Sequence, residues 1–204
     1  MRMFRRAAIS AGQQTGIVFD RFNRADGDIG TADSGETWTG QSPIGWIVTS
    51  GKAKRATATN TIFDSFASLA LPESIGDYTV EADMTIPIYP EAALLYGRGQ
   101  SGSAYAIAVR VYYDKIYLVE LGSDTRIAST LANYAHSLSP GDQCNIRLKL
   151  SGTNATIYLN RVQIISNAVS AWAGATRVSV GMIESYSSGT PTVLFDNFKV
   201  THNT

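Results

Sequence analysis

Several tyrosines and arginines of this chain lie on segments where their side chains could bind a ligand. An aromatic ring can stack on a sugar ring or fill a protein interface, and an arginine supplies forked hydrogen-bond donors. Arg110 and Tyr112 fall on the same face of an alternating segment as Ala106 and Ala108, whose small side chains would leave a shallow groove. The alternative is ordinary cross-strand packing, with Arg110 paired to a carboxylate. The candidate ligand-binding residues are Glu81, Asp83, Tyr96, Arg98, Arg110 and Tyr112. We expect the two carboxylates of this set to lie beside the groove.

Five aspartates could contribute oxygen ligands to a cation. Asp26, Asp28 and Asp33 form an acidic, glycine-rich stretch that could coordinate calcium, and Asp20 and Asp196 could share a cation if the end strands pair. The ligand spacing of an EF-hand is absent, because no glutamate closes the loop in the required place. Side-chain bonding within turns explains these residues better. We therefore predict no metal site and no cofactor.

Two other motifs carry no chemistry of their own. Cys144 is the one cysteine of the chain, so no disulfide can form within the chain and no cysteine-based zinc site can be built. It lies on the apolar face of residues 143–151, which indicates a buried core thiol. The glycine-rich stretch Gly97–Ser103 lacks the Lys-Ser/Thr of a phosphate-binding loop and is interpreted as a flexible connection.

The elements that must position these residues are short β-strands. Residues 78–86, 104–112 and 143–151 alternate apolar with polar or small side chains, which is the period of a strand with one buried face. A tight connection at Asp114-Lys115 and a turn at 151–154 predict hairpins. The sequence predicts about ten or more short strands and no convincing amphipathic helix. This pattern indicates an all-β, two-sheet antiparallel sandwich. Residues 63–71 could be a strand or a helical turn closed by Pro72.

Length and charge narrow the possible functions. The chain has 204 residues, which suits one domain, and its 17 basic and 17 acidic residues give a formal net charge of zero. This balance supplies no general field to attract nucleic acid or an anionic membrane. No segment reaches the roughly 18 apolar residues of a membrane span, and the start lacks the apolar run of a signal peptide. We expect residues 1–18 to be an arm, either disordered or ordered against a neighbouring subunit, and residues 19–204 to be the sandwich.

Three pieces of the sequence, in this order, resemble the concanavalin A-like, or laminin-G-like, jelly-roll superfamily over residues 19–201. They are Asp20–Gly30 followed by Trp38, Gly76–Met84 followed by Ala104–Val109, and Leu194–Val200. The resemblance implies two curved sheets, one concave face and paired first and last strands. That pairing would set Phe22 near Phe195 or Phe198. The Phe-Asn-Arg-Ala-Asp-Gly motif is similar to motifs in bacteriophage virion proteins, notably minor tail proteins, and to modules of bacterial glycan-binding proteins.

The resemblance also provides a test for catalysis. Laminarinase-type glycosidases of this fold carry Glu-x-Asp-x-x-Glu on one strand, and their two glutamates must lie close together across the sugar bond. Glu81 and Asp83 match the first two acidic positions, but Ile86 occupies the place of the second glutamate. We therefore predict that the protein is not an enzyme.

These observations favour a non-enzymatic structural protein of a bacteriophage particle: a minor tail, capsid decoration or host-adhesion component. The expected location is the virion, assembled in the host cytoplasm, and the expected partners are other virion subunits, further copies of the chain and a host-surface glycan. Neither nucleic acid nor membrane insertion is expected. The alternative is a free carbohydrate-binding lectin module, and the third interpretation is a degenerate glycoside hydrolase.

Overall fold

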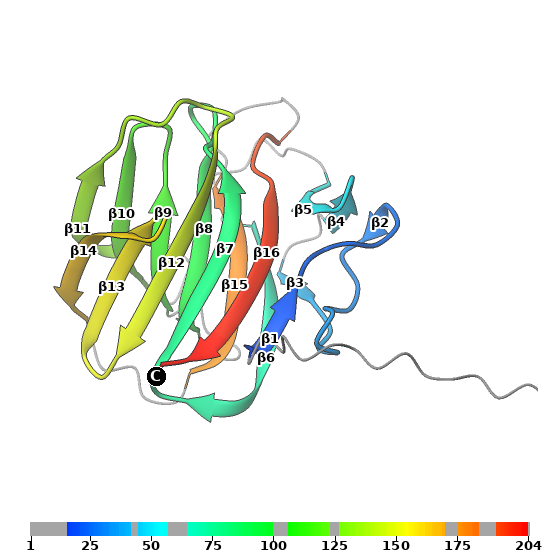
Figure 1. Ribbon diagram of the computed structural model, residues 1–204, viewed down its shortest axis with the longest axis horizontal. Helices are drawn as coiled ribbons and strands as arrows, with labels where there is room; N and C mark the ends of the chain where they lie inside the picture. Colours follow the sequence, from blue (N-terminus) through cyan, green and yellow to red (C-terminus); the bar gives the residue numbers. More distant parts are fainter. Residues whose placement is uncertain are drawn as a thin grey trace, which may run out of the picture.

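Residues 16–41, 45–56, 65–99, 106–122, 127–169, 175–183 and 191–203 are described by a computed structural model (Figure 1). The regular structure of these residues is entirely β-strand, and among them no helix is long and apolar enough to cross a membrane. The strands are β1 (Gly16–Asp20), β2 (Gly27–Asp28), β3 (Thr39–Gln41), β4 (Trp46–Thr49), β5 (Lys52–Arg55), β6 (Ser65–Ile75), β7 (Tyr78–Thr85), β8 (Ala92–Gly99), β9 (Ala106–Val111), β10 (Lys115–Leu121), β11 (Ile127–Ala135), β12 (Gln143–Ser151), β13 (Asn154–Leu159), β14 (Val162–Ala168), β15 (Ala175–Ile183) and β16 (Phe195–His202).

The described strands form two antiparallel sheets that pack face to face (Figure 1). One sheet has nine strands in the order β14-β13-β12-β7-β16-β5-β4-β2, with β1 also paired to β16. The other has seven strands in the order β11-β10-β9-β8-β15-β6-β3. The predicted all-β, two-sheet antiparallel sandwich is therefore confirmed.

The core lies between the sheets because the strands alternate in the way the sequence predicts. Tyr78, Val80, Ala82 and Met84 of β7 are fully buried on its inner face. The thiol of Cys144 on β12 is also buried, and this burial raises its pKa to about 12, as expected for an inert core residue. The alternate side chains of each strand therefore lie on the outer face of its sheet, where they are available to bind a ligand.

The first and last strands pair, as the resemblance implies. Asp20 of β1 lies opposite Phe198 of β16, and the ring of Trp38 stands between two phenylalanines, 5.7 Å from Phe22 and 5.2 Å from Phe198 between centroids. The strand β1 begins at Gly16, and its Val18 is fully buried. Residues 16–18, which the sequence analysis placed in the arm, thus belong to the sandwich, and residues 1–15 lie outside the described part of the chain.

One strand boundary differs from the sequence prediction. Pro72 does not close a strand: β6 runs on to Ile75. The β6–β15 ladder shifts register between the pairs Ala70–Arg177 and Ile75–Ala175. A residue without an N–H group is tolerated in such an irregular stretch, because no regular ladder bond is required of it.

A glycine sets the spacing of the sheets near the site. A Cβ atom at Gly97 of β8 would lie 2.6 Å from Leu150 Cδ1 and 3.2 Å from Leu148 Cδ2, both on β12 of the facing sheet. A larger residue at position 97 would therefore have to displace these two leucine side chains.

Candidate functional site

The six predicted binding residues are divided between the two sheets. Glu81 and Asp83 lie on β7 in the nine-stranded sheet, whereas Tyr96, Arg98 and Arg110 lie on β8 and β9 in the seven-stranded sheet. The expectation that the carboxylates lie beside the Arg110 groove is wrong. Both sets point away from the core, but a sandwich has two outer faces and they occupy different ones.

The outer face of the seven-stranded sheet ends in a pocket of about 360 Å³. Four tyrosines and one arginine dominate its lining, which consists of Tyr89, Arg110, Tyr112, Tyr113, Asp114, Tyr117 and Thr130. We refer to this set as the tyrosine pocket. Its volume lies at the lower end of the range of small-ligand sites. Arg110 and Tyr112 therefore do line a hollow, as the sequence analysis expected of them.

The β9–β10 hairpin positions the centre of the pocket. Its tight turn is Tyr113-Asp114 rather than Asp114-Lys115, because Tyr112 N donates to Lys115 O at 2.8 Å. In this register Arg110 lies directly opposite Tyr117. The two side chains therefore share the outer face, and Tyr113 and Asp114 are presented at the tip of the hairpin.

The guanidinium of Arg110 is held by an aromatic ring instead of an acid. Its Cζ lies 4.5 Å from the ring centroid of Tyr112, close enough for a cation–π interaction. Its Nε is buried and has no hydrogen-bond acceptor in the described part of the chain. A buried donor without an acceptor is costly, but this feature alone does not identify a ligand site, because the Nε atoms of Arg24 and Arg98 are buried without an acceptor in the same way.

The remaining tyrosines shape the rim and support of the pocket. The rings of Tyr89 and Tyr113 meet edge-on with centroids 5.6 Å apart, and those of Tyr112 and Tyr117 meet in the same way at 5.7 Å. Tyr89 is 70% exposed and Tyr113 39% exposed, so two rings remain open to a ligand. Large exposed aromatic side chains grouped around a hollow are typical of a binding surface.

Tyr96 and Arg98 do not reach the tyrosine pocket. Tyr96 is buried in an apolar cluster on the outer face of the sheet, with its ring 5.6 Å from that of Phe66. Arg98 is 3% exposed, and its Nη2 donates to Gly76 O at 3.0 Å. Its backbone N donates to the hydroxyl of Tyr78 at 2.6 Å. Both residues hold the fold, so their assignment to a ligand site is not supported by their positions.

Glu81 belongs to a polar ladder across the outer face of the nine-stranded sheet. Its carboxylate accepts hydrogen bonds from Arg147 Nε at 2.9 Å and Asn145 Nδ2 at 3.0 Å, and it lies 3.4 Å from Lys199 Nζ. Asn145 also donates to Asp83 at 2.8 Å. Beside this ladder is a hollow of about 300 Å³, lined by Thr79, Glu81, Arg147, Lys149, Tyr158, Lys199, Thr201, His202 and Asn203. We refer to it as the polar hollow.

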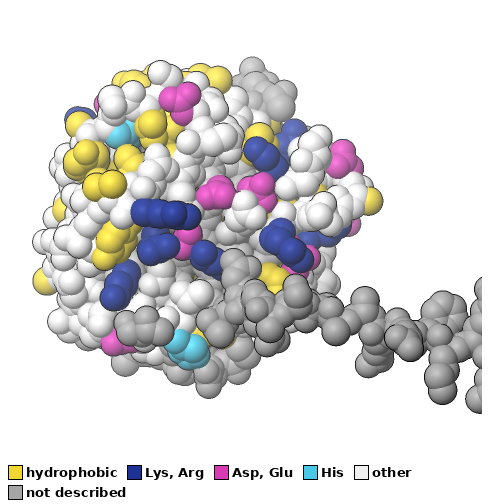
Figure 2. Space-filling model, viewed as in Figure 1, with side chains coloured by type: hydrophobic (Ala, Val, Ile, Leu, Met, Phe, Trp, Pro, Cys, Tyr) yellow, Lys and Arg dark blue, Asp and Glu magenta, His cyan; other side chains and the backbone are white. Residues whose placement is uncertain are grey.

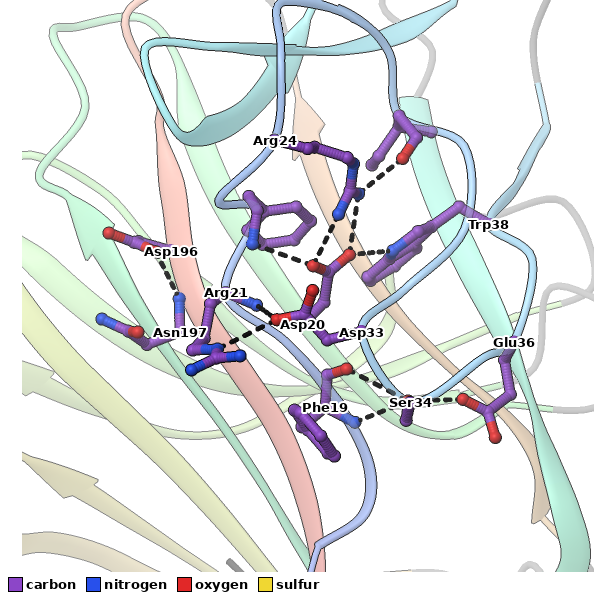
Figure 3. Close-up of polar contacts among 12 residues, drawn as sticks. Phe19, Asp20, Arg21, Arg24, Asp33, Ser34, Glu36, Trp38, Asp196 and Asn197 are labelled. Atoms are coloured by element: carbon purple, nitrogen blue, oxygen red, sulfur yellow. Dashed lines mark hydrogen bonds and ion pairs between the residues drawn. The ribbon is translucent and has the colours of Figure 1, made fainter. Parts of the chain in front are cut away.

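The aspartate that begins the family-like motif has a structural role (Figure 3). The buried carboxylate of Asp20 accepts hydrogen bonds from Phe22 N and from both terminal nitrogens of Arg24, each at 2.8 Å, and from Trp38 Nε1 at 2.7 Å. These hydrogen bonds raise the pKa of Arg24 above its ordinary value. We refer to these four residues as the Asp20 clasp. Both carboxylate oxygens are engaged within the protein, so Asp20 is a poor candidate for the cation ligand that the sequence analysis considered and set aside.

The other aspartates considered for calcium are also not grouped around a common point. Asp26 caps a turn by accepting a hydrogen bond from Ser50 N at 2.8 Å, whereas Asp28 is exposed on β2. Burial, together with the negative charges of Asp83 and Asp20, raises the pKa of Asp196. In the part of the chain described here, no group of three or more His, Cys, Asp or Glu residues could hold a metal ion.

Sequence reasoning missed several residues of the tyrosine pocket. Tyr117 could have been found from the hairpin, since it shares the outer face with Arg110 under either placement of the turn. Tyr89 precedes β8 in a loop, and no periodic signal connects it with the hairpin. Trp172 lies between Ser170-Ala171 and Ala173-Gly174, a setting that predicts a core anchor or a rim residue, but it is outside the described residues.

Comparisons with known proteins identify the fold. No protein-family model matches the sequence, and no curated protein matches it. The carbohydrate-binding module CBM66 from Bacillus subtilis matches with a TM-score of 0.61 and 19% identity, covering 80% of this chain and 94% of the module. The Emp47p carbohydrate recognition domain matches with a TM-score of 0.60 and 10% identity, covering 92% and 95%. The exoplasmic/lumenal domain of VIP36, in a form bound to Ca²⁺ and Man3GlcNAc, matches with a TM-score of 0.57 and 12% identity, covering 82% and 85%. At these identities the likeness shows the fold alone: a concanavalin A-like jelly roll of the kind used by carbohydrate-binding domains.

Proposed function

We propose that this protein is a carbohydrate-binding domain whose ligand site is the tyrosine pocket. The observation that carries the proposal is the pocket itself, in which the Arg110 guanidinium lies against Tyr112 beside the exposed rings of Tyr89 and Tyr113. Arg110 forms no ion pair with a described residue, so its terminal nitrogens can donate to saccharide hydroxyls. The fold of the similar carbohydrate-binding domains supports the same assignment without locating the site.

The lining suits a sugar ring in two complementary ways. The tyrosine rings offer flat apolar surface for the C–H face of a pyranose or furanose, and their hydroxyls remain polar. Arg110 supplies donors and Asp114 supplies an acceptor, so hydroxyl groups pointing in opposite directions can both be satisfied. One cation and one carboxylate leave this lining without an excess of charge. We therefore expect a neutral saccharide.

A glycan array followed by calorimetry tests the proposal. Tyr112→Ala should weaken binding of the best neutral glycan by about 1 kcal/mol or more, because it removes an aromatic anchor. Arg110→Leu should weaken it further by removing the donors. The matched control is Tyr158→Ala, which removes a tyrosine that stacks on an arginine of the other sheet, with 5.9 Å between Arg147 Cζ and the ring centroid. That control should bind normally.

Two results would contradict this proposal. The first is an array without any bound glycan. The second is full affinity in both pocket variants, with unchanged unfolding curves, which would place a saccharide site elsewhere on the molecule.

The placement of the protein in a bacteriophage particle stays a prediction. It rests on the Phe22–Gly27 motif, whose Phe22 and Arg24 have structural roles in the Asp20 clasp. Such a motif indicates a shared way of closing the sandwich rather than a shared location. Detection of the chain in purified virions, with loss of incorporation after deletion of residues 1–15, would support the particle role. In such a particle, the tyrosine pocket would serve host adhesion.

A further inference from the structure

A second surface of the molecule combines several cations with a hollow. Figure 2 shows lysine and arginine side chains gathered over β7, β12 and β16 on the outer face of the nine-stranded sheet. The polar hollow on this face is lined by Arg147, Lys149 and Lys199 and by a single carboxylate, Glu81. With His202 neutral, this lining has an excess of two positive charges, although the whole chain is formally neutral.

The carboxylate in the hollow is already satisfied. Both oxygens of Glu81 accept hydrogen bonds, one from Arg147 Nε and one from Asn145, and Lys199 lies beside it. These contacts fix the arginine by its inner nitrogen. The terminal nitrogens of Arg147 donate no hydrogen bond to any described residue, and the remaining contact of its guanidinium is with the ring of Tyr158. A planar pair of donors is therefore available for an anion.

The flanking lysines extend this positive surface. Lys149 forms no close ion pair with a described residue, although its charge adds to the hydrogen bonds from Gly152 N and Ser151 Oγ in lowering the pKa of the Asp77 carboxylate. The Lys199 side chain is 27% exposed. The nearest acidic pair, Asp83 and Asp196, lies opposite each other one step further along the sheet and outside the lining of the hollow. An anionic group in the hollow would thus lie beside three cations, and the carboxylate of the hollow, Glu81, is already hydrogen-bonded.

We propose that the polar hollow binds an anionic sugar residue, with its carboxylate or sulfate on Arg147, Lys149 and Lys199 and its ring beside Tyr158. The positive charge is confined to a hollow of about 300 Å³, which suits one localised anionic group and not a long polyanion. A nucleic acid would need a basic track or several stacking rings. This site is independent of the tyrosine pocket, so the domain would contact acidic and neutral parts of a glycan on opposite faces.

Calorimetry with three short saccharides tests the site on the full chain at low ionic strength. The probes are an oligogalacturonate, a sulfated dextran oligosaccharide and a neutral dextran oligosaccharide of the same length. We expect one or both acidic probes to bind, and the difference between them identifies the carboxylate or the sulfate as the preferred group. Added salt should weaken the binding, because the cations are partly exposed and are screened. Failure of both acidic probes to bind would overturn the proposal.

Charge-removing variants locate the site. Lys149→Gln and Lys199→Gln should each weaken acidic-probe binding by about fivefold, the upper end of what one exposed ion pair contributes. The matched control is Lys54→Gln on β5 of the same sheet, outside the hollow, which should change the affinity by less than about twofold. Tyr112→Ala should leave acidic-probe binding unchanged. This variant separates the failure of this proposal from that of the tyrosine pocket.

Three outcomes would overturn the assignment. Loss of acidic-probe binding in Tyr112→Ala would place the anion in the tyrosine pocket. If Lys54→Gln weakened binding as much as Lys149→Gln or Lys199→Gln, the attraction would come from the overall positive charge and not from the hollow. Tighter binding of a duplex DNA oligonucleotide than of either acidic saccharide would replace the sugar by a nucleic acid.

Discussion

The Asp20 clasp and the tyrosine pocket both combine an arginine, an aspartate and aromatic rings, but the clasp stabilises the fold and the pocket is the proposed ligand site. In each, an arginine lies near an aromatic ring: Arg24 Cζ is 5.4 Å from the centroid of Phe22, and Arg110 Cζ is 4.5 Å from that of Tyr112. Both terminal nitrogens of Arg24 are bonded to a fully buried carboxylate. Arg110 has no ion pair with any described residue, although Asp114 lines the same pocket. Nε is buried without an acceptor in both arginines, so the difference lies in the terminal nitrogens: an acid of the protein binds those of Arg24, whereas those of Arg110 remain available to a ligand.

The largest effect that tests this comparison is expected from the carboxylate of the clasp. Asp20→Ala should lower the free energy of unfolding by about 3–5 kcal/mol, because it leaves the Arg24 guanidinium and the Trp38 N–H without their acceptor. The measurement is urea unfolding followed by tryptophan fluorescence. Asp114→Ala is the control, and it should change the stability by less than about 0.5 kcal/mol. Similar losses in both variants would contradict the comparison.

Removing each arginine sharpens the comparison. Arg24→Leu should cost roughly 2–3 kcal/mol of stability, because Asp20 loses two charge-assisted hydrogen bonds inside the fold. Arg110→Leu should leave the stability within about 0.5 kcal/mol of the wild type, since its Nε gives up no hydrogen bond to a described residue. Parallel urea titrations measure both values. A large loss in Arg110→Leu would mean that this arginine is also structural, and the proposed pocket would lose its main support.

The alternation of apolar and polar residues predicted part of these two regions, because it shows which face of a strand a side chain lies on but not which sheet the strand joins. The period of residues 78–86 and 104–112 identified the inner and outer faces of their strands, and it placed Arg110 with Tyr112. It could not report that Glu81 and Arg110 lie on different sheets. That division depends on the long-range pairing of β7 with β16 and of β8 with β15, between segments about a hundred residues apart.

Local signals also failed where tertiary contacts compensate for them. A proline usually ends a strand. Pro72 does not, because it falls where the β6–β15 ladder shifts register and requires no N–H group from it. The sequence correctly predicted that aspartates of this region bond to the backbone within turns, since the Asp20 side chain accepts a hydrogen bond from Phe22 N. Its distant partner Trp38 was part of the family-like pattern, but nothing in the sequence indicated a hydrogen bond between Trp38 and Asp20.

A smaller effect is expected at Asp196, which lies close to the clasp and accepts a hydrogen bond from Asn197 N (Figure 3). Burial raises its pKa in the folded protein. With the smaller contributions of the Asp83 and Asp20 charges, it outweighs the Asn197 hydrogen bond and the Lys52 charge, which lower the pKa. A raised folded pKa means that the protonated form is favoured, so its contribution to stability is present below the unfolded pKa, about 4, and is lost as the pH rises through the folded value. Asp196→Asn should therefore be more stable than the wild type at neutral pH, and the difference should shrink as the pH falls through the raised pKa of Asp196 toward about 4. Urea midpoints measured across this pH range would show a constant difference if the charge were unimportant.

The smallest effect is expected in catalysis, where we predict none. A retaining glycosidase needs two carboxyl groups about 5 Å apart, one to attack the sugar and one to donate a proton. Glu81 has both carboxylate oxygens bonded within the protein, one to Arg147 and one to Asn145. The place of the second glutamate in the Glu-x-Asp-x-x-Glu pattern is taken by Ile86, which is fully buried in the core. Incubation with β-glucans, fructans and polyuronates should release no reducing sugar above a buffer blank. Turnover that Glu81→Gln abolishes would establish catalysis on the polar face and would make that face a substrate cleft, whereas turnover that persists in this variant would point to a contaminating hydrolase.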